Sequence, residues 1–314
     1  MTIEVLVELK LKKIDKTFTY SVPQNLEEQI KVGIRVLVPF GKQKLEGFVL
    51  KINNNLKHDF SLKDILMVID NDSVLNREML ELGLYISKKT LAPLISCYQT
   101  MLPSALKAKK NLHVNKKYVT YLKLNNITNS SSLTNKQRQI IDLFKGSNHI
   151  LKKDALAISS SSTKTLLNKG IIMEYKEEVY RLDDSFQKKD NRVKLNDQQL
   201  KAVNEVISNL NFFKPYLLFG VTGSGKTEVY MHIIEHIISL NKEAIVLVPE
   251  ISLTPQMVNI FSSRFGYNVA ILHSRLSEGE KYDEWRKIER KEVKIAIGAR
   301  SAIFAPLENI GIII

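Results

Sequence analysis

The sequence predicts a multidomain chain with three parts: a β-rich N-terminal domain, a small unit of three helices and a β-ribbon, and an α/β domain. Alternating apolar and polar residues, typical of half-buried strands, predict the first part within residues 1–52. Short helical patterns followed by strand-like residues predict the second within 118–183. From residue 195, strand-like and helix-like segments alternate, which indicates a parallel sheet with helices on both faces. The predicted domain boundaries are 1–107, 108–187 and 188–314.

Strands dominate the N-terminal part. They are expected at 3–11, 16–23, 32–41 and 44–52, and the last two flank Lys42–Gln43 as in a hairpin. Glycines between them mark turns or bulges, so a small barrel or curled sheet should result. A helix is expected over 73–90 with Ser73 as its N-cap, whereas residues 102–117 are basic and irregular and suit a linker.

The middle part begins with a helix over 133–146, capped by Thr134 and carrying apolar residues on one face. Short helices should follow at 151–159 and 162–170, and then a two-strand ribbon over 171–182 that turns near Lys176–Glu178. Three helices and a ribbon are winged-helix order. Winged helices often bind DNA, but many serve only as protein-contact modules. A polar linker is expected over 184–194.

The α/β part alternates regularly. Strands are expected at 216–220, 243–250, 269–274, 293–299 and 310–314, and helices at 195–203, 227–241, 254–265 and 278–292. In such open sheets the loops at the carboxyl ends of the strands contact ligands.

The charge indicates the class of partner. The net charge is +13 and the pI about 9.5, which favours nucleic acid or an acidic membrane surface, although a Lys-rich, solvated surface is the alternative. The single cysteine, Cys97, excludes a disulfide framework and a Cys-based zinc site within these residues, and we expect it to be a small core residue. Neither a signal-peptide pattern nor a membrane-length apolar run is present, so we expect a cytoplasmic protein.

The strongest motif is GVTGSGKT, which fits G-x-x-x-x-G-K-[ST] between a predicted strand and a predicted helix. Its glycines let backbone N–H groups face phosphate oxygens, and the helix dipole adds to the attraction. Lys226 would reach the β- and γ-phosphates of ATP, and the Thr227 hydroxyl would hold Mg²⁺. The alternative is a Gly-rich turn with a chance Lys-Thr pair. The predicted nucleotide-binding residues are Gly220, Val221, Thr222, Gly223, Ser224, Gly225, Lys226 and Thr227.

Other candidates are less specific. Gln199 lies upstream of the P-loop, where a Gln can read the adenine edge; alone, its segment would be an ordinary helix surface. Glu250, Arg300 and Ser301 follow predicted strands and are candidate DNA contacts in the α/β domain, with ordinary loop residues as the alternative.

Together these stretches resemble one family, the bacterial replication-restart helicases known as primosomal protein N′. The stretches GVTGSGKTEVY, LVPEISLTPQ, LHSRLSEGE and IGARSAIFAPLENIGIII are similar to that family's first helicase motifs. DKTFTYSVP and VGIRVLVPFGK are similar to its N-terminal 3′-DNA-binding domain. The resemblance implies a superfamily 2 helicase whose α/β part is the first RecA-like lobe.

The family also implies a pocket for the 3′ end of the leading strand. In this sequence the pocket would consist of Phe18 as an aromatic wall, Gly41, which lets the DNA approach the backbone closely, and Lys63 as a partner for a phosphate. The family often has Asp after the Phe, and Thr19 stands there instead, which puts one contact to the terminal nucleotide in doubt.

The family's next motif after GIII is an acidic D-E-E-H, which holds Mg²⁺ and activates water. That motif, the second lobe with its arginine finger and the zinc module with its cysteines do not occur in this sequence. We therefore expect an N-terminal portion with an incomplete first lobe and negligible ATPase, and zinc only in the absent C-terminal part.

Two hypotheses remain open. The first is an ATP-dependent helicase that binds abandoned forks and D-loops, unwinds the lagging-strand arm and helps to load the replicative helicase. The family implies primosome proteins and single-stranded-DNA-binding protein as partners, a cytoplasmic, nucleoid-associated location and no membrane contact. The second is a fork-DNA-binding module with at most ATP binding.

Overall fold

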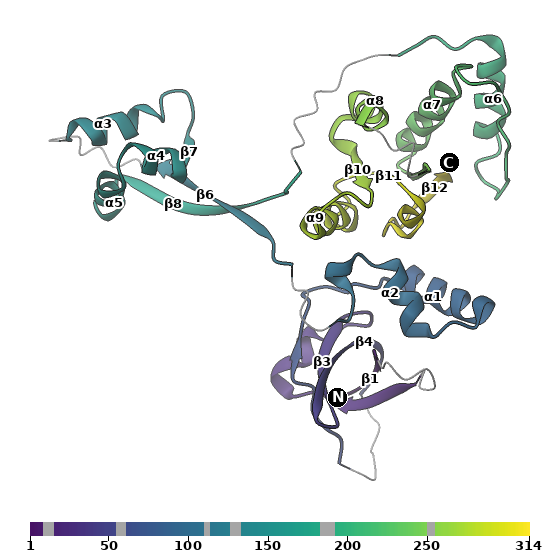
Figure 1. The fold of residues 1–314 in the computed structure, drawn as a ribbon, viewed down its shortest axis with the longest axis horizontal. Helices are drawn as coiled ribbons and strands as arrows, with labels where there is room; N and C mark the ends of the chain where they lie inside the picture. Colours follow the sequence, from purple (N-terminus) through teal and green to yellow (C-terminus); the bar gives the residue numbers. More distant parts are fainter. Residues whose placement is uncertain (9–15, 55–60, 110–113, 126–132, 183–191, 250–254) are drawn as a thin grey trace. The chain divides into compact units, whose positions relative to one another are not determined.

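The computed structural model describes residues 1–8, 16–54, 61–109, 114–125, 133–182, 192–249 and 255–314. They divide into a large unit, Met1–Val114 with Asp184–Ile314, and a small unit, Asn115–Asp183. Figure 1 traces the elements of each. Within the described residues, no helix has the length and apolar character needed to cross a membrane.

The N-terminal part of the large unit is a five-stranded antiparallel sheet in the order β2-β1-β4-β3-β5. Its strands are β1 (Thr2–Val7), β2 (Thr17–Ser21), β3 (Arg35–Phe40), β4 (Gln43–Asn53) and β5 (Met67–Val68), with a short 3₁₀ helix, η1 (Gln24–Gln29), after β2. Phe40 pairs with Gln43, so the hairpin turn is Gly41–Lys42 and the predicted Lys42–Gln43 turn was wrong by one residue. Gly41 has φ +57°, which a glycine adopts without strain.

The two ends of this sheet meet, as a barrel requires. The Ser21 N–H donates to the Lys63 carbonyl and the Ile65 N–H donates to the Ser21 carbonyl, both at 3.0 Å. The same segment reaches the opposite edge, because the Leu66 N–H donates to the Leu37 carbonyl in β3 at 2.8 Å. Interior β-branched side chains fill the curled sheet, an arrangement in keeping with the expected small barrel or curled sheet.

Two helices follow the barrel, α1 (Arg77–Thr90) and α2 (Leu94–Met101), and then a 3₁₀ turn, η2 (Ser104–Leu106). Asn76 caps α1, so the prediction of Ser73 was wrong; the Ser73 hydroxyl donates to the Val32 carbonyl instead. The prediction of a linker over 102–117 was also wrong in part. Leu102, Leu106 and Ala108 are buried in a shared core, because apolar side chains are interspersed among the lysines there.

The small unit packs three helices against a three-stranded antiparallel sheet in the order β7-β6-β8. Its elements are β6 (Lys117–Leu124), α3 (Asn135–Asp142), β7 (His149–Leu151), α4 (Lys152–Ile158), α5 (Ser160–Asn168) and β8 (Ile172–Val179). Thr134 forms a capping box with Gln137, which confirms Thr134 as the N-cap of α3. The predicted ribbon turn at Lys176–Glu178 was wrong: β8 runs straight through it, because all eight of its residues pair with β6.

The α/β part of the large unit holds a parallel sheet in the order β10-β11-β9-β12. Its elements are α6 (Asp197–Ile207), α7 (Lys226–Ser239), β9 (Glu243–Leu247), α8 (Pro255–Phe265), η4 (Gly266–Asn268), β10 (Val269–Leu272), α9 (Glu278–Glu289), β11 (Ile295–Gly298), η5 (Arg300–Phe304) and β12 (Ile310–Ile313). Side chains of α7 and α8 share one core with the strands, and α9 shares another. Helices therefore cover both faces, as predicted.

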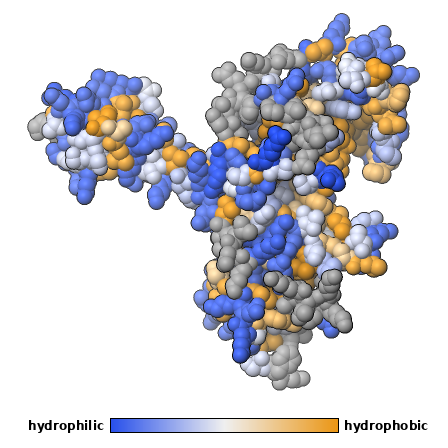
Figure 2. All heavy atoms as spheres, in the orientation of Figure 1, coloured by the Kyte–Doolittle hydropathy of each residue, from blue (hydrophilic) through white to orange (hydrophobic). Residues whose placement is uncertain are grey.

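One predicted strand is missing from this sheet. Residues 216–220 form no strand and pair with none of the described strands, although their composition is strongly apolar. Instead, Lys214 and Tyr216 bind α6 through Glu205, with Nζ to Oε1 at 2.9 Å and the phenol donating to the carbonyl at 3.2 Å. Leu217 and Phe219 are consequently about nine-tenths exposed. Figure 2 shows that hydrophobic residues reach the surface in several places in this view.

Candidate nucleotide and DNA-binding sites

The P-loop leads directly into helix α7. Gly225 is the N-cap of α7 and has φ +79°, as does Gly223 two residues earlier. Left-handed backbone at both glycines curls the loop so that successive N–H groups turn inward, and Lys226 is the first helical residue. The loop is open to solvent, since Gly220 to Ser224 are all exposed.

The ammonium of Lys226 bridges the start of the loop. Its Nζ donates to the carbonyl oxygens of Gly220 at 2.8 Å and Val221 at 2.9 Å. A positive charge thus lies inside the curl of the loop, next to the positive end of the α7 dipole. Both features attract an anion, so the geometry fits a phosphate chain.

Gln199 connects helix α6 to this loop. Its Nε2 donates to the Ser224 carbonyl at 3.1 Å, and its Oε1 accepts from the Asn196 N–H at 3.0 Å in the capping box of α6. A Cβ on Gly225 would lie 2.4 Å from Nε2, so the contact depends on a glycine at that position. The structure thus places the Gln199 amide against the P-loop, and its predicted role in reading the adenine edge stays a prediction.

Few of the described side chains beside the P-loop are suited to bind a metal ion. Thr227 lies in the first turn of α7, half-buried, where its hydroxyl could join a Mg²⁺ ion brought by a nucleotide. Within the described ranges, no group of three or more His, Cys, Asp or Glu is arranged to hold a metal ion. The described residues thus offer a nucleotide with its Mg²⁺ the phosphate cradle, the Lys226 ammonium and the Thr227 hydroxyl.

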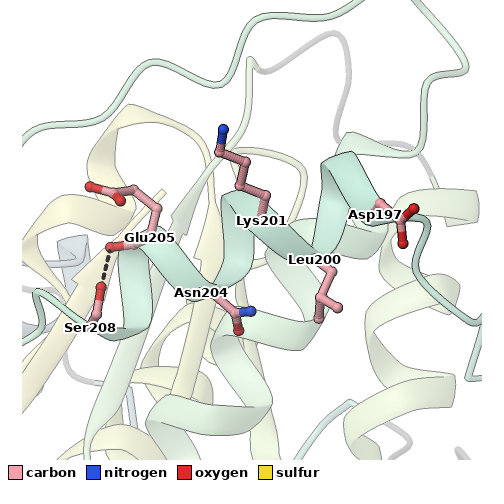
Figure 3. A pocket seen from close by; sticks show the side chains of 6 residues that line it. All are labelled: Asp197, Leu200, Lys201, Asn204, Glu205 and Ser208. Carbon is pink, nitrogen blue, oxygen red and sulfur yellow. Dashed lines mark hydrogen bonds between the residues drawn. The ribbon is translucent and has the colours of Figure 1, made fainter.

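A shallow hollow lies on the exposed side of α6, with a volume of about 490 Å³. Figure 3 shows its lining: Asp197, Leu200, Lys201, Asn204, Glu205 and Ser208. All six side chains come from one helix, and the Ser208 hydroxyl donates to the Glu205 carbonyl of the same helix at 3.2 Å. Because these groups do not converge from several elements, the hollow does not form a specific ligand site.

The predicted 3′-end residues lie on the barrel. Phe18 on β2 meets Phe40 at the end of β3, with ring centroids 5.0 Å apart and nearly perpendicular planes. Gly41 follows Phe40 directly, and a Cβ added there would meet nothing within 4 Å. Phe18 and Gly41 are thus brought together by an aromatic residue, Phe40, that the sequence analysis missed. Its position immediately before the turn glycine was the available signal.

The other two predicted pocket residues lie differently. Lys63 is exposed, and its backbone lies beside β2 through the bond to Ser21. Thr19 pairs in register with Glu4, whereas Phe18 pairs with the buried Val5. Adjacent strand residues point to opposite faces, so Thr19 does not share the face of Phe18.

The loops after the parallel strands meet at one edge of the sheet. The Val248 N–H donates to the Gly298 carbonyl at 2.8 Å, and the Ala299 N–H donates to the Leu272 carbonyl at 3.3 Å. Arg300 and Ser301, both exposed, begin η5 directly after this junction. Glu250 lies outside the described residues.

His273 belongs to the same edge, just after β10. Its Nδ1 accepts a hydrogen bond from the Arg275 N–H at 3.1 Å. Partial burial, and then the charge of Arg275, lower the pKa of His273 below its ordinary value.

Ion pairs around the buried Arg264 join helix α8 to α7, the helix that follows the P-loop. Arg264 on α8 is almost fully buried and contacts Glu235 at 2.7 Å and Glu228 at 3.2 Å, both on α7. This cluster could not be predicted from the sequence, because Arg and Glu at helical spacing are typical of a solvated surface.

Comparison with known proteins gives two family matches. Residues 4–103 match the PriA 3′ DNA-binding domain, and residues 192–311 match the family described as the type III restriction enzyme, res subunit. The first match covers the barrel with α1 and α2, and the second covers the P-loop and the parallel sheet.

Full-length relatives agree with these matches. The chain is 39% identical to replication restart protein PriA of Bacillus subtilis over 99% of its own length and 48% of that protein. It is 31% identical to PriA of Chlamydia muridarum, over 99% of the chain and 43% of that protein. It is 32% identical to PriA of Haemophilus influenzae, over 96% of the chain and 42% of that protein. The chain thus spans about half the length of these relatives or less, and it belongs to the PriA family of replication restart proteins.

Proposed function

We propose that this chain supplies the 3′-end-binding and ATP-binding parts of a replication-restart DNA helicase. The observation that carries the proposal is the P-loop, where Lys226 Nζ lies 2.8 and 2.9 Å from two loop carbonyls at the head of α7. ATP phosphates would draw the ammonium away from these carbonyls, and Thr227 would contribute to Mg²⁺ binding.

The barrel supplies the proposed DNA-binding function. The exposed turn at Gly41, the Phe18–Phe40 ring pair and Lys63 would receive the leading-strand 3′ end of a fork or D-loop. Arg300 and Ser301 at the edge of the parallel sheet would contact the DNA backbone, and Glu250 stays a further candidate for a DNA contact. The net charge of +13 makes such binding sensitive to salt.

The proposed role of the whole protein follows its family. It would unwind the lagging-strand arm with ATP, promote loading of the replicative helicase, and act with primosome proteins and single-stranded-DNA-binding protein. We place this work in the cytoplasm, at the nucleoid. Zinc would belong to a part of the protein that these residues do not include.

A second candidate is a fork-DNA-binding module with at most ATP binding. It is favoured by residues 216–220, which approach the P-loop without joining the sheet. Hydrolysis requires the phosphates to be held rigidly against a positioned water. Because residues 216–220 pair with no described strand, the P-loop that follows them is less constrained.

A single substitution tests the nucleotide site. Lys226→Ala should abolish binding of a fluorescent ATP analogue while leaving fork affinity within about twofold, because the proposed partner of this lysine is the phosphate chain of ATP and not DNA. We expect negligible hydrolysis by the 314-residue chain itself. If the variant binds the ATP analogue as tightly as the unmodified chain, Lys226 is not part of the nucleotide site. Measurable hydrolysis that depends on Lys226 would exclude the second candidate function.

DNA with modified ends tests the barrel. Forks with a 3′-hydroxyl should bind more tightly than forks with a 3′-phosphate, and Phe18→Ala should remove that preference. Equal affinities of the unmodified chain for both forks would rule out a 3′-end pocket at Phe18, Gly41 and Lys63.

A further inference from the structure

The sheet of the small unit has one face that its helices do not cover. Leu122 and Leu124 of β6, with Ile172 of β8, face the helices and belong to the core. Side chains alternate along a strand, so Tyr121 and Lys123 face the other way. Registered partners share a face, which places Tyr175 opposite Tyr121, and Met173 and His149 opposite Lys123.

Three rings from three strands meet on this open face. Tyr121 and Tyr175 stack across β6 and β8, with ring centroids 5.7 Å apart and planes inclined by 22°. His149 of β7 meets Tyr121 edge to face at 5.5 Å. Tyr121 is therefore held between two rings in a fixed orientation.

Tyr175 has one ring face left open. It stacks on Tyr121 toward the middle of the sheet, and β8 is an edge strand, so the opposite ring face is turned beyond the sheet. The side chain remains 37% exposed and its neighbour Met173 is 52% exposed. A flat, supported and solvent-facing ring next to a polarizable thioether is a surface on which a nucleobase can stack.

The net positive charge of the small unit favours an anionic ligand. Residues 115–183 contain twelve Lys and Arg against six Asp and Glu, so 69 of the 314 residues hold +6 of the net +13. The open face carries Lys117 and Lys123 from β6 and one carboxylate, Glu177, from β8. An acidic polymer with planar, unpaired groups fits this combination of lysines and rings.

We propose that the open face of the β7-β6-β8 sheet binds single-stranded DNA, with a base stacked on Tyr175 and the backbone along the lysines. The inference rests on the proposed DNA-binding function of the chain, and it adds a site that needs no strand end. Double-stranded DNA would not bind in this way, because its bases are already stacked on one another.

A circular single-stranded oligonucleotide tests this site in the full chain. A circle has no 3′ end, so its binding is independent of the proposed barrel pocket. We expect a circle of thymidines to bind, and Tyr175→Ala to weaken binding at least about fivefold. Tyr175→Phe, which keeps the ring, should stay within about twofold.

Tyr118→Ala is the matched control. Tyr118 lies on the same strand as Tyr121 and is 53% exposed, but it faces the other side of the sheet. Its loss should leave circle binding within about twofold. An abasic circle, which keeps the phosphates, should bind the unmodified chain as weakly as the thymidine circle binds Tyr175→Ala.

Several results would overturn the proposal. They are no binding of the circle, equal binding of thymidine and abasic circles, or equal losses for Tyr175→Ala and Tyr118→Ala. A face that serves a protein partner instead would give the first or the third of these results. Failure of the 3′-hydroxyl preference on linear forks would concern the barrel pocket alone.

Discussion

The side-chain amide of Gln199 joins two structural elements, because Nε2 donates to the Ser224 carbonyl of the P-loop at 3.1 Å while Oε1 completes the cap of α6. The capping box and the loop contact thus depend on the same side chain. This arrangement couples the start of α6 to the phosphate cradle.

Gln199→Ala should weaken ATP binding more than Asn196→Ala does. Both variants lose the capping box, at about 1 kcal/mol of helix stability, but only the first loses the bond to Ser224. Titration with a fluorescent ATP analogue, alongside urea unfolding, separates the two effects. Equal affinities for the two variants would show that Gln199 acts only as a cap.

Gly225→Ala should disrupt the P-loop more than Gly223→Ala. Both glycines have φ +79°, so both substitutions cost about 1 kcal/mol of backbone strain. A Cβ at Gly225 would also collide with Gln199 Nε2 at 2.4 Å, whereas a Cβ at Gly223 meets nothing within 4 Å. We expect ATP affinity to fall several-fold further for Gly225→Ala. If both variants lose equal affinity, the strain and not the Gln199 contact sets the loop conformation.

Local patterns predicted most of this fold correctly. The Thr134 cap, the curled N-terminal sheet and the parallel strands follow from side-chain periodicity and capping chemistry, which act over a few residues. The P-loop was equally accessible, because a short motif with glycines at fixed spacing specifies its own backbone.

The errors lie where distant contacts decide. Residues 216–220 are apolar enough for a strand, but Lys214 and Tyr216 bind Glu205 on α6. The ribbon turn failed because β8 pairs along its full length with β6, some fifty residues earlier in the chain. Phe40 could be noticed from its position before the turn glycine, but its contact with Phe18 depends on how the barrel closes, which no local pattern reveals.

The single tryptophan should report unfolding of the barrel region. Trp285 on α9 is 3% exposed and shares a core with Leu106 and Ala108, which follow α2. Leu106→Ala should cost about 2–5 kcal/mol and shift Trp285 emission to longer wavelength, because water gains access to the cavity. Leu84→Ala, at a site 45% exposed on α1, is the control and should leave the emission unchanged. An unshifted spectrum for Leu106→Ala would exclude this shared core.

Arg35 should not tolerate replacement by lysine. Its guanidinium contacts both Asp70 oxygens, at 2.6 and 2.9 Å, and donates to the carbonyls of Ala105 and Lys107. A lysine cannot reproduce this planar fork, so buried acceptors lose their donors. We expect Arg35→Lys to lower the free energy of unfolding by about 2–4 kcal/mol, measured in urea. A loss below about 1 kcal/mol, as for the exposed Arg77–Glu81 pair, would contradict this.

Acidification should destabilise the large unit through His273. Its native pKa lies below the ordinary 6.5, so the folded protein favours the neutral ring that accepts from the Arg275 N–H. The stability from this group is fully present above about pH 6.5 and is lost as the pH falls through the lower native value.

His273→Asn removes the titration and keeps a possible acceptor. Relative to this variant, the unmodified chain should lose free energy of unfolding between about pH 7 and 5, while the difference stays constant above about pH 7. Subtracting the two curves cancels every other titrating group. NMR titration of the His273 ring gives the native pKa directly. A value at or above 6.5, or parallel stability curves at all pH values, would refute the assignment.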